Sequence, residues 1–422
     1  MSGSGGRRSR PLGLVVLIAA FVLLHGLLGV AGLVPGLGGP WADPTPFGDV
    51  ISVYRFWIDY WHQNGQLVGI DTPWVYPLLA LVPMLAVSVA GDAAYGPVWV
   101  VLVTLLDVGA LVLVARRSRR LAWWWVLFTA CLGPVAIGRI DAVALPIAIA
   151  GVLVIGSRPL LATVLLSVAT WVKVWPAAVI AALLVAGKRT AAVITGVAFT
   201  SAVVIGGAVA LGAGRNVFSF VAAQTGRGLQ VEAPVTGLWL IDVLLRVPGA
   251  SVYYDRDILT FQVAGVGVTQ TAAVMTAVLA VGALIVLGLA LLARLRGGRD
   301  EDVVALTAFG LVSAFLALNK VGSPQYLTWF VAPILLGLLT TRRFRFPAIV
   351  VPIMAVLTQL VYPWGYSLVV NAAPIGIIVL ELRNLLEVVL LAWTIGALLR
   401  TRAETTPGTR PQPERLPDRA LS

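Results

Sequence analysis

The stretch L-G-L-V-V-L-I-A-A-F-V-L-L-H-G-L-L-G-V-A-G-L-V, Leu12–Val34, consists of apolar residues and glycines apart from one histidine. A helix needs about 20 such residues to cross the hydrocarbon core of a bilayer. The run is too long for the apolar part of a signal peptide, and no A-x-A cleavage pattern follows it. We therefore interpret Leu12–Val34 as an uncleaved first membrane span, preceded by a cytoplasmic N-terminus at residues 1–11.

The composition extends this interpretation to the whole chain. Of its 422 residues, 59% are hydrophobic and 12% are charged, and the mean hydropathy is +0.94. Soluble domains carry about 25% charged residues, so a soluble protein is excluded. Long apolar runs recur along the sequence, which predicts an all-α polytopic membrane protein with about 10–12 helical crossings of the lipid bilayer.

The formal net charge of +11 does not indicate nucleic-acid binding. The basic residues cluster in short joints between apolar runs, as the positive-inside rule produces for cytoplasmic loops. No basic surface interleaved with aromatic residues accompanies them. We predict a plasma (inner) membrane protein with both termini cytoplasmic and these joints on the same side: Arg116–Arg120, Lys188–Arg189, Arg294–Arg299 and Arg342–Arg345.

The apolar runs divide into spans that leave two long loops outside. The candidate spans after the first are Val98–Ala115, Leu121–Ile137, Ala142–Ile155, Ala191–Leu211, Thr269–Leu292, Val303–Leu318, Tyr326–Leu339, Phe346–Val361 and Ile377–Leu399. The external loops are expected at about residues 35–76 and 212–268, within a transmembrane domain at 12–400. The proline-rich tail at 401–422 is predicted to be disordered and cytoplasmic.

Two segments of the N-terminal half allow different topologies. If Pro77–Ala90 crosses the bilayer and every later span crosses in turn, the joint Arg116–Arg120 lies outside. That position contradicts the positive-inside rule. The interpretation we prefer makes Pro77–Ala90 a shallow or re-entrant helix. Leu160–Gly187 then enters and returns as two half-helices broken near Lys173–Pro176, because irregular backbone at membrane depth is tolerated beside a cavity.

The first external loop contains F-G-D-V-I-S-V-Y-R-F-W-I-D-Y-W, Phe47–Trp61. Its aromatic residues recur at helical spacing over Val50–Trp61, which predicts an amphipathic helix along the membrane surface. Asp49 begins this helix and has two interpretations. It can be an N-cap or a base that accepts a proton from a hydroxyl group of the acceptor. The two roles can coexist, because one carboxylate oxygen can cap the helix while the other faces the cavity.

Five short motifs follow one another along the chain. They are G-D-V-I-S-V-Y (Gly48–Tyr54) with W-V-Y-P-L-L (Trp74–Leu79), G-R-I-D-A (Gly138–Ala142), W-V-K-V-W-P (Trp171–Pro176), R-G-L-Q-V-E-A-P (Arg227–Pro234) and N-K-V-G-S-P-Q-Y-L-T-W (Asn319–Trp329). In order and membrane setting they resemble the GT-C membrane glycosyltransferases that use polyprenyl-phosphate sugars, and within them glycosyltransferase family 87, which includes actinobacterial α-mannosyltransferases.

The resemblance implies a GT-C-type bundle that transfers a hexose on the external face with inversion, with Asp49 as the general base. It implies a polyprenyl-phosphate sugar donor and a lipid-linked or cell-envelope glycan as acceptor. One departure concerns the sugar: where the mannosyltransferases tend to carry paired histidines, this chain has Ser323–Tyr326. Mannose is therefore not fixed as the hexose.

Polar residues near the outer ends of the spans are candidate substrate-binding groups. Lys173 and Lys320 are either phosphate-binding cations or interfacial lysines. Arg139 and Asp141 either orient the donor headgroup or form a structural ion pair. The full candidate set comprises Tyr54, Tyr76, Arg139, Asp141, Lys173, Gln224, Arg227, Gln230, Glu232, Lys320, Ser323, Gln325 and Tyr326.

No cofactor or metal site is expected. The chain has one cysteine and two histidines, which cannot form a zinc site of the usual composition. The D-x-D pair Asp255 and Asp257 lies in the second external loop, where no nucleotide sugar is expected. The sequence favours a glycosyltransferase; the alternative is a transporter or flippase of lipid-linked sugars.

Overall fold

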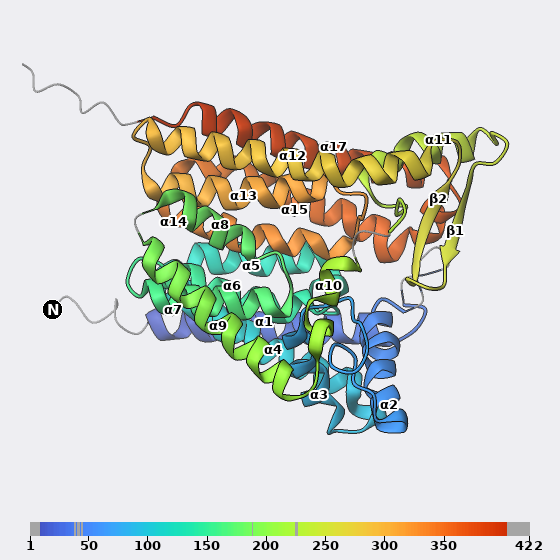
Figure 1. Ribbon diagram of the computed structural model, residues 1–422, viewed down its shortest axis with the longest axis horizontal. Helices are drawn as coiled ribbons and strands as arrows, with labels where there is room; N and C mark the ends of the chain where they lie inside the picture. Colours follow the sequence, from blue (N-terminus) through green and yellow to red (C-terminus); the bar gives the residue numbers. More distant parts are fainter. Residues whose placement is uncertain are drawn as a thin grey trace, which may run out of the picture.

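The computed structural model describes residues 9–37, 39, 43, 45–187, 189–223 and 227–402. The remaining residues, which include most of both predicted terminal segments, lie outside the described part. The described chain forms a bundle of long helices with a group of loops and short helices at one end (Figure 1). The main helices of the bundle, long and short, are α1 (Ser9–Leu33), α4 (Tyr95–Arg117), α5 (Arg119–Leu132), α6 (Asp141–Val154), α9 (Thr190–Ala210), α12 (Val268–Leu295), α13 (Asp300–Leu318), α14 (Val331–Thr340), α15 (Arg345–Gln359) and α17 (Pro374–Leu399).

Six segments within the described residues are long and apolar enough to cross a membrane. They are Leu12–Leu33, Asp92–Arg117, Thr190–Ala210, Val268–Leu295, Asp300–Leu318 and Arg345–Trp364. Shorter apolar helices, including Asp141–Val154 and Pro324–Thr340, fill the interior between them. The prediction of an all-α multi-pass membrane protein is confirmed.

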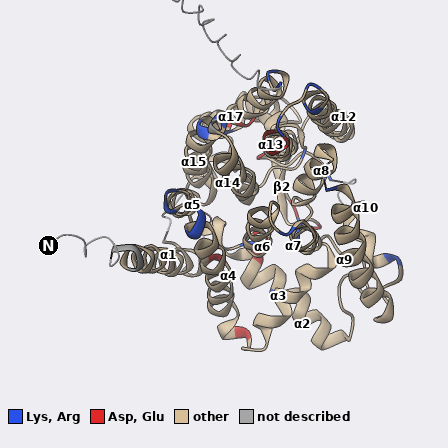
Figure 2. Ribbon diagram, turned by 90° about the vertical axis from the view of Figure 1, so that its left-hand side faces the viewer, with Lys and Arg blue, Asp and Glu red and all other residues tan. Residues whose placement is uncertain are grey.

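The arginine-rich joints gather at the left-hand end of Figure 1, which Figure 2 views directly. We call it the arginine-rich end. Its turns are tied together by arginine side chains: Arg117 donates to the carbonyl of Leu153 at 3.1 Å, and Arg294 donates to that of Val185 at 2.8 Å. The joint at Arg116–Arg120 therefore lies on the same side as the later ones, as the charge pattern predicted.

The segment after α6 turns back inside the bundle. Helix α7 (Pro159–Val172) stops at a break over Lys173–Pro176, and α8 (Ala177–Ala186) returns. Arg189, just after α8, donates hydrogen bonds to the carbonyls of Ile155 and Gly156, just before α7. Both ends of the segment thus lie at the arginine-rich end, and the expected pair of half-helices is present.

The opposite end, which we call the loop end, carries the short elements. These are α2 (Arg55–Asn64), α3 (Leu81–Ser88), α10 (Ser219–Ala222), α11 (Gly237–Leu244), α16 (Tyr366–Val370) and the antiparallel hairpin of β1 (Ser251–Asp255) and β2 (Thr260–Ala264). The short helix expected at Pro77–Ala90 is present over Leu78–Ser88, as a 3-10 turn that continues into α3. The hairpin was not predicted from the sequence.

The lengths of two short helices determine how far below the membrane surface the polar residues at the loop end lie. Helices α6 and α7 have 14 residues each and share the turn at 155–158. At 1.5 Å per residue each is about 21 Å long, against about 30 Å for the hydrocarbon core. Their far ends, Asp141 and Val172, therefore lie below the level that a full span would reach.

Candidate active site

Asp49 is held at the loop end by the phenylalanine two residues before it. The Phe47 ring is fully buried. It packs against Gly32 of α1 and Gly138, where an added Cβ would lie 2.2 and 2.5 Å from the ring. Only glycine permits this approach, so the two glycines fix the point at which the loop after α1 enters the bundle.

The carboxylate of Asp49 pairs with a buried arginine. Asp49 opens a wide π-helical turn, Asp49–Tyr54, that continues into α2. The N-cap is Gly48, and no side-chain capping bond forms there, so the interpretation of Asp49 as an N-cap is wrong. Instead its Oδ2 lies 3.2 Å from Nε of Arg139, and its side chain is 34% exposed.

Three oxygens fix the guanidinium of Arg139. Its Nη1 donates to the carbonyls of Pro46 at 2.7 Å and Gly138 at 2.8 Å, and its Nη2 donates to the phenol oxygen of Tyr362 at 3.2 Å. The side chain of Arg139 is 8% exposed. Arg139 thus aims the carboxylate of Asp49 while leaving part of it accessible.

A second ion pair lies deeper, where α6 begins and α7 ends. Asp141 is buried; its Oδ1 accepts a hydrogen bond from Nε1 of Trp329 at 2.6 Å. Its Oδ2 lies 3.6 Å from Nζ of Lys173. Lys173 therefore has an acidic partner. Arg139 and Asp141 do not form the ion pair that was considered for them, because each binds another residue.

Aromatic rings enclose Lys173. Its Nζ lies 4.5 Å from the centre of the Tyr76 ring and 6.0 Å from that of Tyr326, distances at which a ring face attracts a cation. The Tyr54 ring lies edge-on to Tyr76 at 6.2 Å, and its phenol oxygen accepts the N–H of Ile140 at 3.0 Å. Burial raises the pKa of both Tyr54 and Tyr76, so both phenols stay neutral.

Glu232 comes to this cluster from the segment between α10 and α11. Its backbone carbonyl accepts a hydrogen bond from Nη2 of Arg383 at 2.8 Å, and its Oε2 lies 3.9 Å from Nη1 of the same arginine. Burial raises the pKa of Glu232 to about 7, against the opposing charges of Arg383 and Arg139. This carboxyl group therefore exists in both protonation states near neutral pH.

The loop after α13 lies against the loop of Glu232. The N–H of Gln230 donates to the carbonyl of Lys320 at 3.0 Å. A Cβ on Gly322 would lie 2.5 Å from the backbone carbonyl of Glu232. The side chains of Gln230 and Lys320 are both buried here, and burial lowers the pKa of Lys320.

The helical turn Pro324–Phe330 completes the cluster. Burial raises the pKa of Tyr326 to about 12, and the nearby charge of Arg227 and a hydrogen bond with Ser323 oppose that shift. Gln325 is buried beside them. The structure thus brings together every candidate residue that it describes. Gln224 lies outside the described residues.

Three residues of the cluster were not among the candidates: Trp329, Tyr362 and Arg383. Trp329 stands in a quoted motif, and its indole N–H is the donor to Asp141. Arg383 bridges Glu387 of its own helix, 3.6 Å away, and Glu232 of the loop. No local pattern distinguishes Tyr362 from other aromatic residues near membrane surfaces.

Several acidic residues outside the cluster have structural roles. Asp255 accepts the backbone N–H of Asp257 at 3.0 Å and the side-chain N–H of Gln262 at 3.0 Å, so it shapes the β-hairpin. Asp107 pairs with His25 of α1 at 3.0 Å. Within the described part of the chain, no group of three or more His, Cys, Asp or Glu residues could hold a metal ion.

Comparison with known proteins identifies the family. The family model of glycosyltransferase family 87 matches residues 74–319, more than half of the chain. A search of curated proteins finds no match. The matched segment includes Arg139, Asp141, Lys173 and Glu232, whereas Asp49 precedes it. The chain belongs to glycosyltransferase family 87, and it is a multi-pass membrane glycosyltransferase.

Proposed function

We propose that this protein transfers a hexose from a polyprenyl-phosphate donor to a lipid-linked or cell-envelope glycan, with inversion, at its loop end. The observation that carries the proposal is the pairing of a partly exposed carboxylate, Asp49, with the buried Arg139 beside a second, deeper cation. Such an arrangement suits a reaction in which a hydroxyl group loses a proton and a phosphate departs.

Asp49 acts as the general base. Its Oδ2 faces Arg139, and the rest of the carboxylate accepts the proton of the acceptor hydroxyl group. The hydroxyl oxygen attacks the anomeric carbon from the face opposite the phosphate. The bond from that carbon to the phosphate oxygen breaks, and its electron pair leaves with the polyprenyl phosphate. One displacement of this kind inverts the anomeric configuration, and the proton remains on Asp49.

Lys173 supports the departure of the phosphate. The ends of α6 and α7 place it below the outer surface, where the phosphate of a membrane-embedded lipid would enter. Charge developing on the phosphate oxygens is stabilised by cations fixed in a site with little water. Lys173 can pass from Asp141 to the phosphate, and Arg227 offers a planar group suited to phosphate oxygens. Lys320 lies in the adjoining loop.

The hexose would lie between these cations and the second external loop. Gln230, Glu232, Gln325 and Tyr326 offer donors and acceptors for sugar hydroxyl groups. Because Glu232 has a pKa of about 7, it can either accept or donate a hydrogen bond at neutral pH. The aromatic faces of Tyr76 and Tyr326 would contact the apolar face of the sugar.

The test is sugar transfer by the purified protein in lipid nanodiscs, with a panel of polyprenyl-phosphate hexoses. Asp49→Asn keeps the shape of the side chain but removes its basicity, so we expect kcat to fall by about 10²- to 10⁴-fold. Asp59→Asn is the matched control, since Asp59 lies on α2 and pairs only with Arg55 among the ion pairs of the described residues. Its activity should match the parent.

Equal activity of Asp49→Asn and the parent would remove Asp49 from the chemistry. Absence of transfer with every donor, together with movement of labelled lipid-linked sugar across the bilayer, would favour a flippase instead. Donor binding by Asp49→Asn, measured separately, distinguishes loss of catalysis from loss of the fold.

A further inference from the structure

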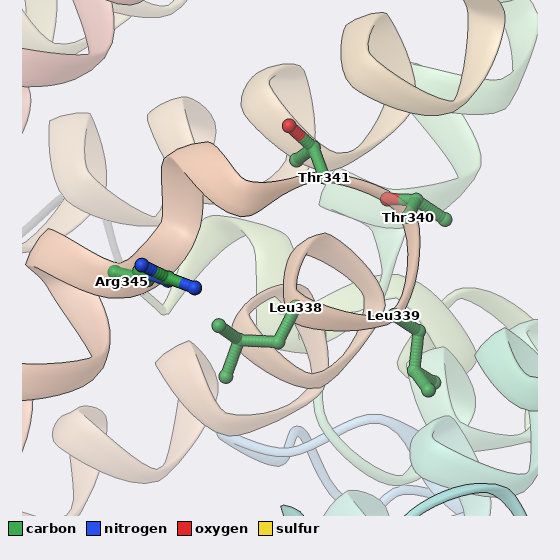
Figure 3. Close-up of a pocket in the computed structure, with 5 residues that line it drawn as sticks. All are labelled: Leu338, Leu339, Thr340, Thr341 and Arg345. Carbon is green, nitrogen blue, oxygen red and sulfur yellow. The ribbon is translucent and has the colours of Figure 1, made fainter.

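Two hollows lie at the arginine-rich end, far from the candidate active site. The first, of about 280 Å³, is lined by Leu338, Leu339, Thr340, Thr341 and Arg345. Arg345 and Leu338 point toward one another across it (Figure 3). The second, of about 350 Å³, is lined by Arg343, Trp393, Ala397 and Arg400. The turn between α14 and α15 separates them.

The second hollow gathers positive charge. Arg343 lies in the short 3-10 turn before α15, and Arg400 directly follows α17; no acidic residue is among the described residues that line the hollow. The guanidinium of Arg343 is fixed in place, since its Nη1 donates to Oγ1 of Thr401 at 2.7 Å. Two arginines that line one hollow make it attractive to an anion.

An apolar stripe leads from this hollow along the bundle. The Trp393 ring contacts Phe346 of α15, with ring centroids 6.0 Å apart. Phe346, Ile349 and Ile353 recur at helical spacing on α15 and are 40%, 64% and 51% exposed. A half-buried tryptophan at the end of an exposed apolar stripe is the arrangement typical of the membrane interface.

We propose that the hollow of Arg343, Trp393 and Arg400 binds the phosphate of an anionic phospholipid, whose acyl chains lie along Phe346, Ile349 and Ile353. Basic pockets between transmembrane helices bind such headgroups. The combination of two arginines with an adjoining apolar stripe favours a lipid over a free anion. This inference is independent of the transferase reaction, because the hollow lies at the other end of the bundle.

The experiment measures lipid adducts of the full chain by native mass spectrometry, with phosphatidylglycerol and phosphatidylcholine of the same acyl chains. We expect the parent to form an adduct with phosphatidylglycerol. The double variant Arg343→Gln/Arg400→Gln should bind this lipid about 30-fold more weakly than the parent does. Arg343→Lys/Arg400→Lys keeps both charges and should retain most of the affinity. The matched control is Arg116→Gln/Arg120→Gln, which removes the same charge at the same end.

Three results would overturn the proposal. An equal loss of binding in the two Arg→Gln double variants, at 343 and 400 and at 116 and 120, would mean that anionic lipid is attracted to the whole arginine-rich end and not to a specific site. Equal binding of phosphatidylcholine would mean that the arginines do not select the headgroup. Displacement of the lipid by excess inorganic phosphate would mean that the hollow recognises a free anion and that the stripe contributes nothing.

Discussion

At the scale of single residues, two carboxylates in one cluster have different surroundings. Asp49 keeps about a third of its side chain exposed and faces one arginine, whereas Asp141 is buried between Lys173 and Trp329. A buried carboxylate with two partners is restrained and holds its neighbours in position. We therefore assign proton transfer to Asp49 and positioning of Lys173 to Asp141.

Glu232 gives a pH dependence of stability that can be measured. Its pKa is about 7 in the folded protein and near 4.5 in a free side chain. Between pH 4.5 and pH 7, Glu232 therefore keeps its proton in the folded protein, whereas the same side chain in the unfolded chain has lost it. The stabilisation is complete below pH 4.5 and is lost as the pH rises through 7, at a cost of up to about 3 kcal/mol.

We expect Glu232→Gln to remove this dependence. The melting temperature of the parent should fall, relative to that of the variant, between pH 5 and about pH 8. Thermal unfolding of the purified protein in detergent, followed at several pH values, measures the difference. Glu301→Gln changes an exposed carboxyl group and is the control. Parallel curves for the parent and Glu232→Gln would contradict the raised pKa.

At the scale of elements, the site depends on segments that stop short of a full crossing. Helices α6 and α7 end within the thickness of the membrane, and the break before α8 delivers Lys173 to Asp141. A charged side chain at such depth is costly unless it is paired. The short helices therefore place Lys173 at this depth, and its ion pair with Asp141 offsets the cost of burying the charge.

The contact of two loops supplies the prediction at this scale. Gly322→Ala would place a Cβ 2.5 Å from the backbone of Glu232, which cannot yield as a flexible side chain would. We expect the loops to separate, the bond from Gln230 to Lys320 to break, and kcat/KM to fall by about 10- to 100-fold. Steady-state transfer assays measure this change.

Gly206→Ala in α9 is the control, since no atom lies within 4 Å of the added Cβ. Its activity should equal that of the parent. Full activity of Gly322→Ala would show that separation of the two loops does not affect sugar transfer. It would also show that transfer does not depend on the position of Glu232.

At the scale of the whole molecule, the arginine-rich joints lie at one end of the bundle and the loops of the candidate active site lie at the other (Figure 1). This separation depends on the α7–α8 segment, because a single crossing there would reverse every later helix. Ser157, before α7, and Thr190, after α8, must therefore face the same side of the membrane.

Labelling with a membrane-impermeant thiol reagent tests this arrangement. In a Cys131→Ala background, Ser157→Cys and Thr190→Cys should react from the same side, and Gln63→Cys of α2 should react from the opposite side. Reaction of positions 157 and 190 from opposite sides would mean that α7 and α8 form one crossing. Labelling after permeabilisation controls for buried thiols.

The sequence predicted most of the fold because its signals are local. Apolar length defined the spans, arginine joints defined one end, and Pro176 in the motif of Lys173 marked the break between half-helices. The β-hairpin at Ser251–Ala264 was missed, since its alternation is short and lies in a loop. The candidate residues within the described part of the chain lie close together at the loop end, and their role in the reaction stays a prediction.

The sequence by itself determined a polytopic bundle with its polar residues at one end, because helix length and charge placement follow from neighbouring residues. Only the tertiary structure decided the partners: Arg139 with Asp49, Lys173 with Asp141, and Arg383 with Glu232. Adjacent residues such as Arg139 and Asp141 could equally have paired with each other. Which ion pairs form depends on how helices far apart in the chain pack and rotate, and no local pattern records that.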